Sequence, residues 1–424
     1  MRRELYWIWL SMACTPGSST FGKLLEKFED AKDIYEASDN TIAALITSKS
    51  KDFKALTDKK LDGARSVLDY CVNKEIGILT YEDGNYPELL RRIPNPPVLL
   101  YYRGNLPNFK EAFPISVVGT RRLTEYGKKN AFLISRDLAR AGAIIVSGMA
   151  MGIDGVSHAG ALSAGGTTVA VIGSGIDVCY PNSHLKLARA IVKSGCVMTE
   201  YAPGSPPNRE NFPRRNRIIS GISNATVIVE GKERSGALLT ARHAKEQGRV
   251  VYAVPGNVSS PTSQLPNLLI KNGARLCTSA DDIIRDFTDK SHGILNPFNI
   301  SSYDRVSVED ELVRYSVSAV CIDDKIFRQE KGKRNVKKSE KKVVLSNNQN
   351  EVYEKQQQSA PSFDGVDKKL LALYKSIPYG DEGCAIEALV TEERSLRDVM
   401  KGLLKLEMIK LVDMLPGERV RRKF

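Results

Sequence analysis

Between residues 115 and 253 the sequence alternates short apolar, β-branched runs with longer segments of helical spacing. The apolar runs are 115–118, 144–146, 169–172, 196–198, 227–229 and 250–252. The segments between them, for example 128–141 and 238–246, repeat apolar residues every three or four positions. Strands that are apolar throughout and are separated by helices are typical of a parallel sheet covered on both faces. The pattern therefore predicts an α/β fold with a doubly wound parallel sheet.

Glycine or a small polar residue follows almost every one of these predicted strands. The residues concerned are Gly119-Thr120, Ser147-Gly148, Gly173-Ser174-Gly175, Gly231 and Gly256. Open α/β sheets bind their ligands outside the carboxyl ends of the strands. We therefore expect the binding site to lie in these loops.

The part of the chain before the sheet has a different pattern. Residues 1–72 show helical spacing interrupted by a turn at 15–18, which predicts a small N-terminal helical domain. We expect this domain to be SAM/HhH-like. We interpret residues 1–14, two arginines and a short apolar run, as its first amphipathic helix rather than a targeting signal. The proline-rich segment 78–106 is expected to be an extended lead-in to the sheet domain, which we place at 75–290.

Regular periodicity ends near residue 290 and returns near the C-terminus. Residues 291–362 carry lysine-rich clusters and a glutamine tract, which predicts a basic disordered linker. Residues 363–424 contain three helical segments and a strand–turn–strand pattern, which predicts a winged-helix domain. Such domains bind DNA or contact other proteins, and the sequence leaves both possibilities open.

Charge and cysteine usage narrow the classes of function. Lys and Arg outnumber Asp and Glu by 62 to 50, so the net charge is +12, and an acidic partner such as nucleic acid or anionic lipid is plausible. The seven cysteines are scattered and form no CxxC motif. This spacing excludes a disulfide scaffold or a zinc site and fits reduced thiols in the cytoplasm. No apolar run approaches the roughly 18 residues that a membrane span needs, so we expect no membrane partner.

Signatures of catalysis and of cofactor binding are missing from the sequence. The loop Gly173-Ser174-Gly175 lacks the third glycine of a dinucleotide fingerprint, and no Walker motif or HExxH motif occurs. Asp154 and His158 lie one helical turn apart, but an aspartate at a helix start is more often a cap than half of a catalytic pair. We therefore expect no catalytic residue, no cofactor and no metal.

The strongest local feature is the segment 212–221, in which Phe212 and a proline precede three arginines within four residues. A helix start that is rich in arginine presents free N–H donors beside guanidinium groups, a combination that suits phosphate oxygens. Phe212 is a candidate for stacking on an unpaired base. The segment therefore predicts an anion site with an aromatic neighbour.

An alternative explains the arginines without a ligand. Arg215 or Arg217 could brace the sheet through a buried carboxylate such as Glu200 or Glu230, and for a single arginine the two interpretations are equally good. The wider pattern favours anion binding, because Arg121-Arg122 follows an earlier strand and contributes to the same edge of the sheet.

A series of ordered motifs makes the chain resemble the bacterial DNA processing protein A family (DprA, also called Smf) over nearly its whole length. The matching segments are 85–87, 103–105, 117–122, 147–154 with His158, 170–177 with Tyr180-Pro181, 212–219, 235–241, 253–256 and 415–422. The sequence departs from the family pattern at 264–267 and in the length of the 291–362 linker.

This resemblance implies an extended Rossmann-like domain that binds single-stranded DNA, commonly as a homodimer through that domain. It also implies a role in loading the RecA recombinase onto incoming DNA during natural transformation, and it implies no reaction. The DNA-binding residues carried over by the resemblance, together with the arginines discussed above, are Arg121, Arg122, Ser147, Gly148, Gly173, Ser174, Phe212, Arg214, Arg215, Asn216, Arg217, Ser235 and Gly236.

Two other functions compete with this interpretation. The first is a nucleotide-binding hydrolase of the phosphoribohydrolase-like kind, although the only echo of its glycine-rich loop is the poor match at 231–236. The second is a winged-helix regulator whose α/β domain senses a ligand, which predicts a preference for duplex DNA in the C-terminal domain. Comparing single-stranded with duplex DNA separates these interpretations.

Overall fold

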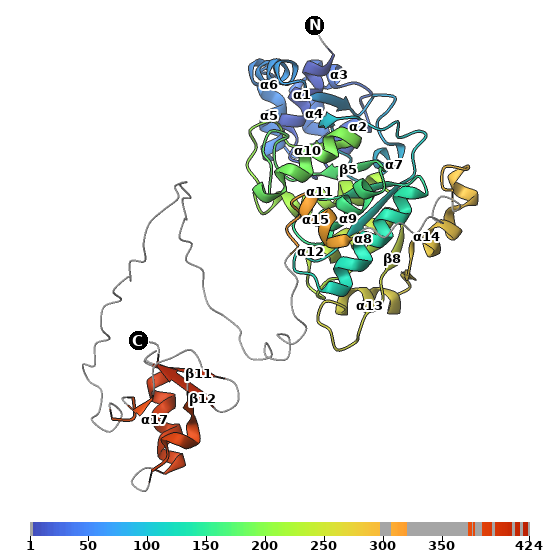
Figure 1. Cartoon of the computed structure of the whole chain (residues 1–424). Helices are drawn as coiled ribbons and strands as arrows, with labels where there is room; N and C mark the ends of the chain where they lie inside the picture. The colour runs from blue at the N-terminus through green and yellow to red at the C-terminus, as the bar shows by residue number, and fades with distance from the viewer. Residues whose placement is uncertain are drawn as a thin grey trace, which may run out of the picture. The chain divides into compact units, whose positions relative to one another are not determined.

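The computed structural model describes residues 3–296 and 307–319 and, nearer the C-terminus, 372–374, 376–377, 384–391, 395–408, 412–415 and 419–422. The chain forms two compact units, Met1–Asn335 and Val336–Phe424, which are taken separately below (Figure 1). Residues 320–371, which include most of the predicted linker, lie outside the described residues.

A nine-stranded sheet organises the first unit, in the order β1-β2-β6-β5-β4-β3-β7-β8-β9. Its strands are β1 (Gly77–Thr80), β2 (Leu99–Gly104), β3 (Pro114–Val118), β4 (Ile144–Ser147), β5 (Thr168–Val171), β6 (Cys196–Thr199), β7 (Ala225–Ile228), β8 (Val250–Ala253) and β9 (Arg275–Leu276). Along the part of this order that runs from β6 through β5, β4, β3, β7 and β8 to β9, each strand is parallel to the next. The predicted doubly wound α/β fold is therefore confirmed, and the order reverses between β3 and β7, where such sheets form a ligand crevice.

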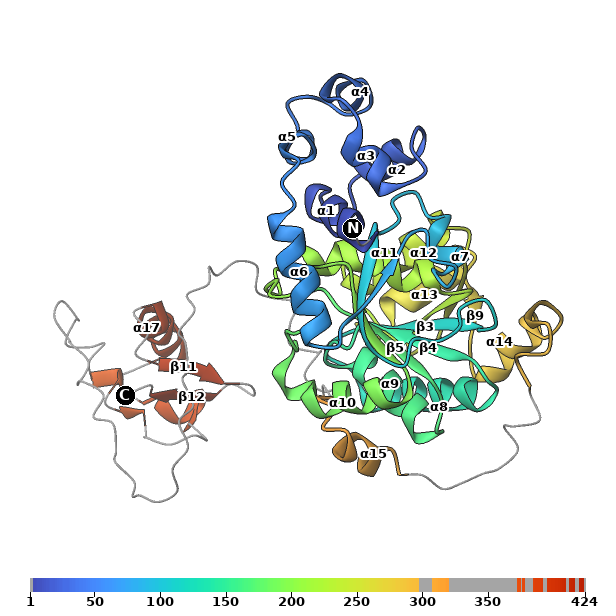
Figure 2. The same ribbon diagram turned by 90° about the horizontal axis from the view of Figure 1, so that it is seen from above.

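Helices cover both faces of the sheet, and Figure 2 shows these two layers on opposite sides of the strands. One layer contains α8 (Glu125–Arg140), α9 (Ile153–Ser163), α10 (Leu185–Ser194) and α14 (Ala280–Phe287), and the other contains α7 (Glu88–Arg91), α11 (Asn211–Ile222), α12 (Gly236–Glu246) and α13 (Gln264–Lys271). Alternate residues of one strand enter different cores: Val169 and Val171 face one layer, and Ala170 faces the other. This burial on both faces explains why the strands are apolar throughout.

The proline-rich segment before the sheet adds two strands to it. β1 and β2 pair with each other in antiparallel fashion, and β2 pairs with β6 in the same way. Tyr86 is buried in the turn between β1 and β2 and donates a hydrogen bond from its hydroxyl to the carbonyl of Pro97. The predicted extended lead-in thus becomes an antiparallel edge of a mostly parallel sheet.

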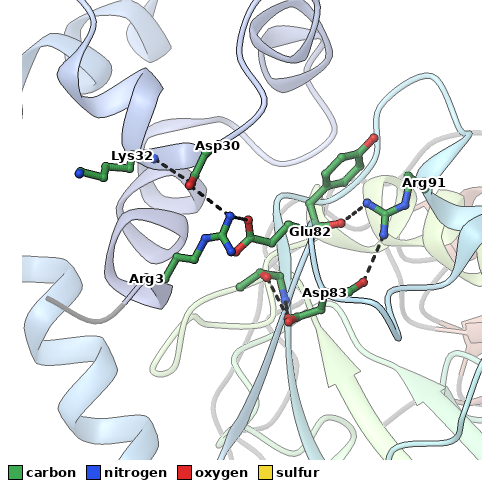
Figure 3. A network of polar contacts seen from close by, with 8 residues as sticks. Arg3, Asp30, Lys32, Glu82, Asp83 and Arg91 are labelled. Carbon is green, nitrogen blue, oxygen red and sulfur yellow. Dashed lines mark hydrogen bonds and ion pairs between the residues drawn. The ribbon is translucent and has the colours of Figure 1, made fainter.

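Six short helices precede β1: α1 (Glu4–Ala13), α2 (Thr20–Leu25), α3 (Ala31–Glu36), α4 (Asp39–Leu45), α5 (Lys51–Asp58) and α6 (Asp62–Asn73). Their core is continuous with the sheet, because Trp7 and Ile8 of α1 share one buried cluster with Tyr101 of β2. Polar contacts add to this attachment: Arg3 pairs with Asp30 and, at 2.6 Å, with Glu82 beside β1 (Figure 3). The SAM/HhH-like assignment stays a prediction.

A short helix lies inside the range assigned to the linker. Residues 307–319 include α15 (Val308–Arg314), which packs against α9 and buries Leu312. The prediction of an unstructured linker over 291–362 is therefore wrong for these residues. The sequence missed α15 because a helix of seven residues gives little periodicity and depends on its packing.

The second unit contains α17 (Leu396–Met408) and a three-stranded sheet of order β10-β12-β11. The strands are β10 (Cys384–Ala385), β11 (Val412–Leu415) and β12 (Arg419–Arg422), and both pairings are antiparallel. Val399 and Leu403 of α17 are buried in a core of this unit's own. The winged-helix assignment remains a prediction. Within the described ranges of both units, no helix combines the length and the apolar character needed to cross a bilayer.

Candidate nucleic-acid interface

A shallow pocket opens at the carboxyl ends of β4 and β5. It is lined by Arg121, Gly148, Ala150, Met151, Ile172, Gly173, Ser174, Tyr180, Pro181 and Phe212. The sequence predicted five of these residues, on four separate loops, as parts of one site. The structure brings them together because parallel strands end at the same edge of the sheet.

One wall of the pocket is aromatic and positively charged. The rings of Tyr180 and Phe212 lie 5.6 Å apart at an angle of 43°, and the guanidinium carbon of Arg121 lies 5.4 Å from the centre of the Phe212 ring. Tyr180 is 45% exposed and Met151, which also lines the pocket, is 40% exposed. Tyr180 and Met151 were not predicted as site residues, although both lie in recognised motifs, Tyr180-Pro181 and 147–154.

Gly148 allows a buried arginine to approach the pocket from behind. A Cβ atom at this position would lie 2.6 Å from both the Arg215 guanidinium and the Asp154 carboxylate. Arg215 donates one Nη1 hydrogen bond to the Gly148 carbonyl at 2.8 Å and another to the Val171 carbonyl. Any side chain at 148 would therefore displace the group that joins the ends of β4 and β5.

Burial changes the protonation equilibrium of Arg215. Desolvation lowers its pKa to about 10, although the nearby Asp154 carboxylate opposes the shift. Arg215 is still charged at neutral pH, and its guanidinium carbon lies 6.0 Å from the Phe212 ring centre. Arg215 therefore braces the sheet, through backbone carbonyls and not through Glu200 or Glu230 as the alternative supposed, and it also places a positive charge directly behind the pocket.

Arg217 points away from the pocket. Its Nη2 lies 2.5 Å from Glu200 Oε2, and the two side chains are only 7% and 5% exposed. Its Nε atom also approaches Gly17 in the turn after α1. The bracing alternative, with Glu200 as the partner, is the arrangement observed for this arginine.

The other predicted residues lie around the pocket or beneath it. Ser147 is fully buried and donates its hydroxyl to the Val117 carbonyl, so it supports the loop from below. Five predicted residues do not line the pocket. Arg122 and Arg214 are exposed. Asn216 donates a hydrogen bond to the carbonyl of Gly236, which with Ser235 forms the start of α12.

His158 and Asp154 do not form a pair open to a substrate. His158 is fully buried, and its Nδ1 lies 2.7 Å from the Thr168 hydroxyl. Burial, with smaller electrostatic contributions from His184 and Arg215, lowers the pKa of His158 to about 3. Within the described residues, no three His, Cys, Asp or Glu side chains gather as a metal site.

Comparison with known proteins identifies the family. The family model described as DNA recombination-mediator protein A matches residues 77–288. The protein Smf of Synechocystis is 30% identical over 430 residues, with 99% of each chain covered. The DNA processing protein DprA of Bacillus subtilis is 40% identical over 223 residues, which cover 53% of this chain and 75% of that protein.

A solved structure supports the same relationship. The X-ray structure of DNA processing protein A from Streptococcus pneumoniae superposes with a TM-score of 0.57 at 33% identity. The match covers 67% of this chain and 97% of that one. The chain therefore belongs to the DNA processing protein A family, whose members are named DprA or Smf, and shares the family's role in DNA processing and recombination.

Proposed function

We propose that the protein binds single-stranded DNA, without sequence preference, at the pocket on the ends of β4 and β5. The observation that carries this proposal is the wall formed by Tyr180, Phe212 and Arg121. Stacking on aromatic rings tolerates every base, and arginine adds a cation–π contribution. A duplex keeps its bases stacked inside, so the same wall favours a single strand.

The surroundings of the pocket suit a phosphate backbone. Gly148 and Gly173 line the pocket at two strand ends without a side chain of their own. Arg122 and Arg214 are both exposed. Arg122 follows the lining residue Arg121, and Arg214 lies two residues after the lining residue Phe212. Exposed arginines and backbone N–H groups bind phosphate oxygens without reading base identity.

We also propose that the protein is a mediator and not an enzyme. In the described part of the chain, the residues that line the pocket include no Asp, Glu, His or Cys side chain. Hydrolysis by a phosphoribohydrolase-like mechanism needs a general acid or base within hydrogen-bond reach of the substrate. Incubation with ATP, NAD or nucleoside monophosphates should give no product above the buffer control, and catalytic product release would contradict this part of the proposal.

The central experiment is a fluorescence anisotropy titration of the full chain with a labelled oligodeoxythymidylate and with a duplex of the same length. We expect tighter binding of the single strand, and a log–log salt slope of about −0.7 per neutralised phosphate. Equal affinity for the duplex, or affinity that does not change with salt, would overturn the proposal.

The family membership leads to two further proposals. The first is that the bound strand is passed to the RecA recombinase, which predicts faster RecA filament formation on DNA already covered by a single-strand-binding protein. The second is a homodimer through the sheet domain, where β9 is an edge strand and its Leu276 is 49% exposed. Light scattering tests the dimer, and a Leu276→Lys variant should shift the equilibrium toward the monomer.

A further inference from the structure

A closed set of hydrogen bonds joins the segment after the sheet domain to two loops of the pocket. The His184 ring contacts the Met149 carbonyl through Nδ1 at 3.0 Å and the Ser318 N–H through Nε2 at 2.9 Å. The Ser318 carbonyl accepts a hydrogen bond from the Gly152 N–H at 3.1 Å. Ser318 thus connects the 149–152 turn with the short helix η1 (Asn182–His184).

The partners of His184 define its tautomer. A carbonyl can only accept, so Nδ1 carries the proton that goes to Met149. A backbone N–H can only donate, so Nε2 must be the unprotonated nitrogen that accepts from Ser318. The neutral ring therefore fits this place with both nitrogens used.

The two loops joined in this way both line the pocket. Ala150 and Met151 line it from the turn after β4, and Tyr180 and Pro181 line it from the segment just before η1. A change in the separation of these loops changes the space beside the Tyr180 ring. Ser318 does not line the pocket, but it contacts both segments that contribute these lining residues.

The 149–152 turn needs support from outside. Met149 has a φ of 54° and Gly152 a φ of 82°, and the left-handed region is strained for a residue other than glycine. A Cβ atom on Gly152 would lie 2.4 Å from the Thr120 carbonyl oxygen. The turn is therefore pressed against the loop that carries Arg121, in a conformation that its neighbours must hold.

The segment Ser307–Ala319, which we name the strap, is itself anchored on the sheet domain. Glu309 of α15 pairs with Lys128 of α8 at 2.9 Å. Leu312 is 7% exposed and belongs to the core between α8, α9 and the sheet. Val317 lies against the backbone of α9 at Gly155. Figure 2 shows α15 on the side of the sheet that carries α9 and α10.

We propose that the strap is a positioning element of the DNA pocket: through Ser318 it holds the 149–152 turn and the Tyr180–His184 segment at the separation that accepts a nucleotide. This proposal rests on the proposed function, since the pocket must bind DNA for its positioning to matter. It assigns a role in ligand binding to residues that lie beyond the sheet domain and contact no ligand themselves.

The test compares two substitutions at one position in the full chain. Ser318→Pro removes the N–H that His184 accepts, whereas Ser318→Ala keeps that N–H and loses only the hydroxyl contact with Ser183. If the turn is competent in about a tenth of the proline variant molecules, its affinity for oligodeoxythymidylate falls roughly tenfold. The alanine variant should bind like the wild type, and the salt slope should be unchanged in both, because the phosphate contacts are the same.

A second pair of variants keeps the test independent of the proline ring. Leu312→Asp places a charge in the core and releases the strap, and Val313→Asp is the matched control because Val313 is 76% exposed. Hydrogen exchange of the peptide that spans residues 149–156 reports whether the turn has been freed. Thermal melting separates this local release from global unfolding.

Each outcome decides the proposal. Faster exchange at 149–156 together with weaker DNA binding, in Ser318→Pro or Leu312→Asp but not in their controls, supports it. Faster exchange with unchanged affinity overturns it, and so does unchanged exchange in both variants. A wild-type protein that fails to bind the oligonucleotide contradicts the proposed function instead, and the exchange data then still show whether the strap holds the turn.

Discussion

Replacing Arg217 by alanine should destabilise the fold rather than remove a DNA contact. Its guanidinium is buried against Glu200, so the variant leaves a carboxylate enclosed without its partner. Breaking a buried pair from one side costs about 3–5 kcal/mol, because the remaining charge keeps its desolvation penalty. We expect a loss of unfolding free energy in this range.

Arg214, three residues before Arg217 in the same helix α11, is a matched control because it is exposed. Its side chain is 41% exposed, and its nearest carboxylate, on Glu210, is 3.8 Å away. An exposed pair of this kind contributes less than about 1 kcal/mol. Arg214→Ala should therefore leave stability nearly unchanged, and the comparison of the two alanine variants isolates the effect of burial.

Urea unfolding followed by tryptophan fluorescence is a suitable assay. Both tryptophans of the chain, Trp7 and Trp9, are buried in α1, and α1 leads directly into the turn that Arg217 approaches at Gly17. In a double-mutant cycle with Glu200→Ala, the double variant should lose less than the sum of the single losses. The reasoning is refuted if Arg217→Ala unfolds like the wild type and binds single-stranded DNA at least tenfold more weakly.

Three further predictions concern the pocket, the buried His158 and the second unit. Arg121→Ala and Tyr180→Ala should each weaken single-strand binding by about 1–3 kcal/mol without shifting the unfolding curve, and unchanged affinity in anisotropy titrations would remove them from the site. His158→Leu should reduce the loss of stability in acid. Burial lowers the pKa of His158 in the folded state from 6.5 to about 3, so the stability that the neutral ring contributes is fully present above pH 6.5 and is lost as the pH falls through this window. If the free energy of unfolding in urea falls equally steeply in both proteins between pH 7 and pH 4, the prediction is contradicted. Truncation after Asn335 should change neither the melting temperature of the first unit nor its single-strand affinity, because Val336–Phe424 is a separate compact unit, whereas a tenfold loss of affinity would move the main contact to the C-terminal unit.

The sheet was predictable because its signals are local. The run at 115–118 is observed as β3, Pro114–Val118, and the alternation of apolar strands and helices needs no knowledge of distant contacts. The same holds for the site loops, since glycines at strand ends are recognised in the sequence and the topology gathers them at one edge. Arg121, Gly148 and Phe212 therefore meet as expected.

Features that depend on packing between distant segments were not predictable. β2 joins the sheet by pairing with β6, almost one hundred residues later. The Tyr180 ring lies beside the Phe212 ring because η1 and α11 start near the same strand ends. No local sequence pattern predicts this contact between two aromatic rings. α15 depends on burying Leu312 in the core that α8 and α9 share with the sheet, which its own sequence does not indicate.

Arg215 shows that bracing and ligand binding are not exclusive. It joins the ends of β4 and β5 through the carbonyls of Gly148 and Val171, and it remains charged next to the pocket although Asp154 offsets part of that charge. A charge screened little by solvent acts on a phosphate beyond hydrogen-bond distance. Loss of DNA binding in an Arg215 variant therefore does not identify a contact, because the same side chain fixes the shape of the pocket. Arg217, paired with Glu200 and directed away from the pocket, has only the structural part of this role.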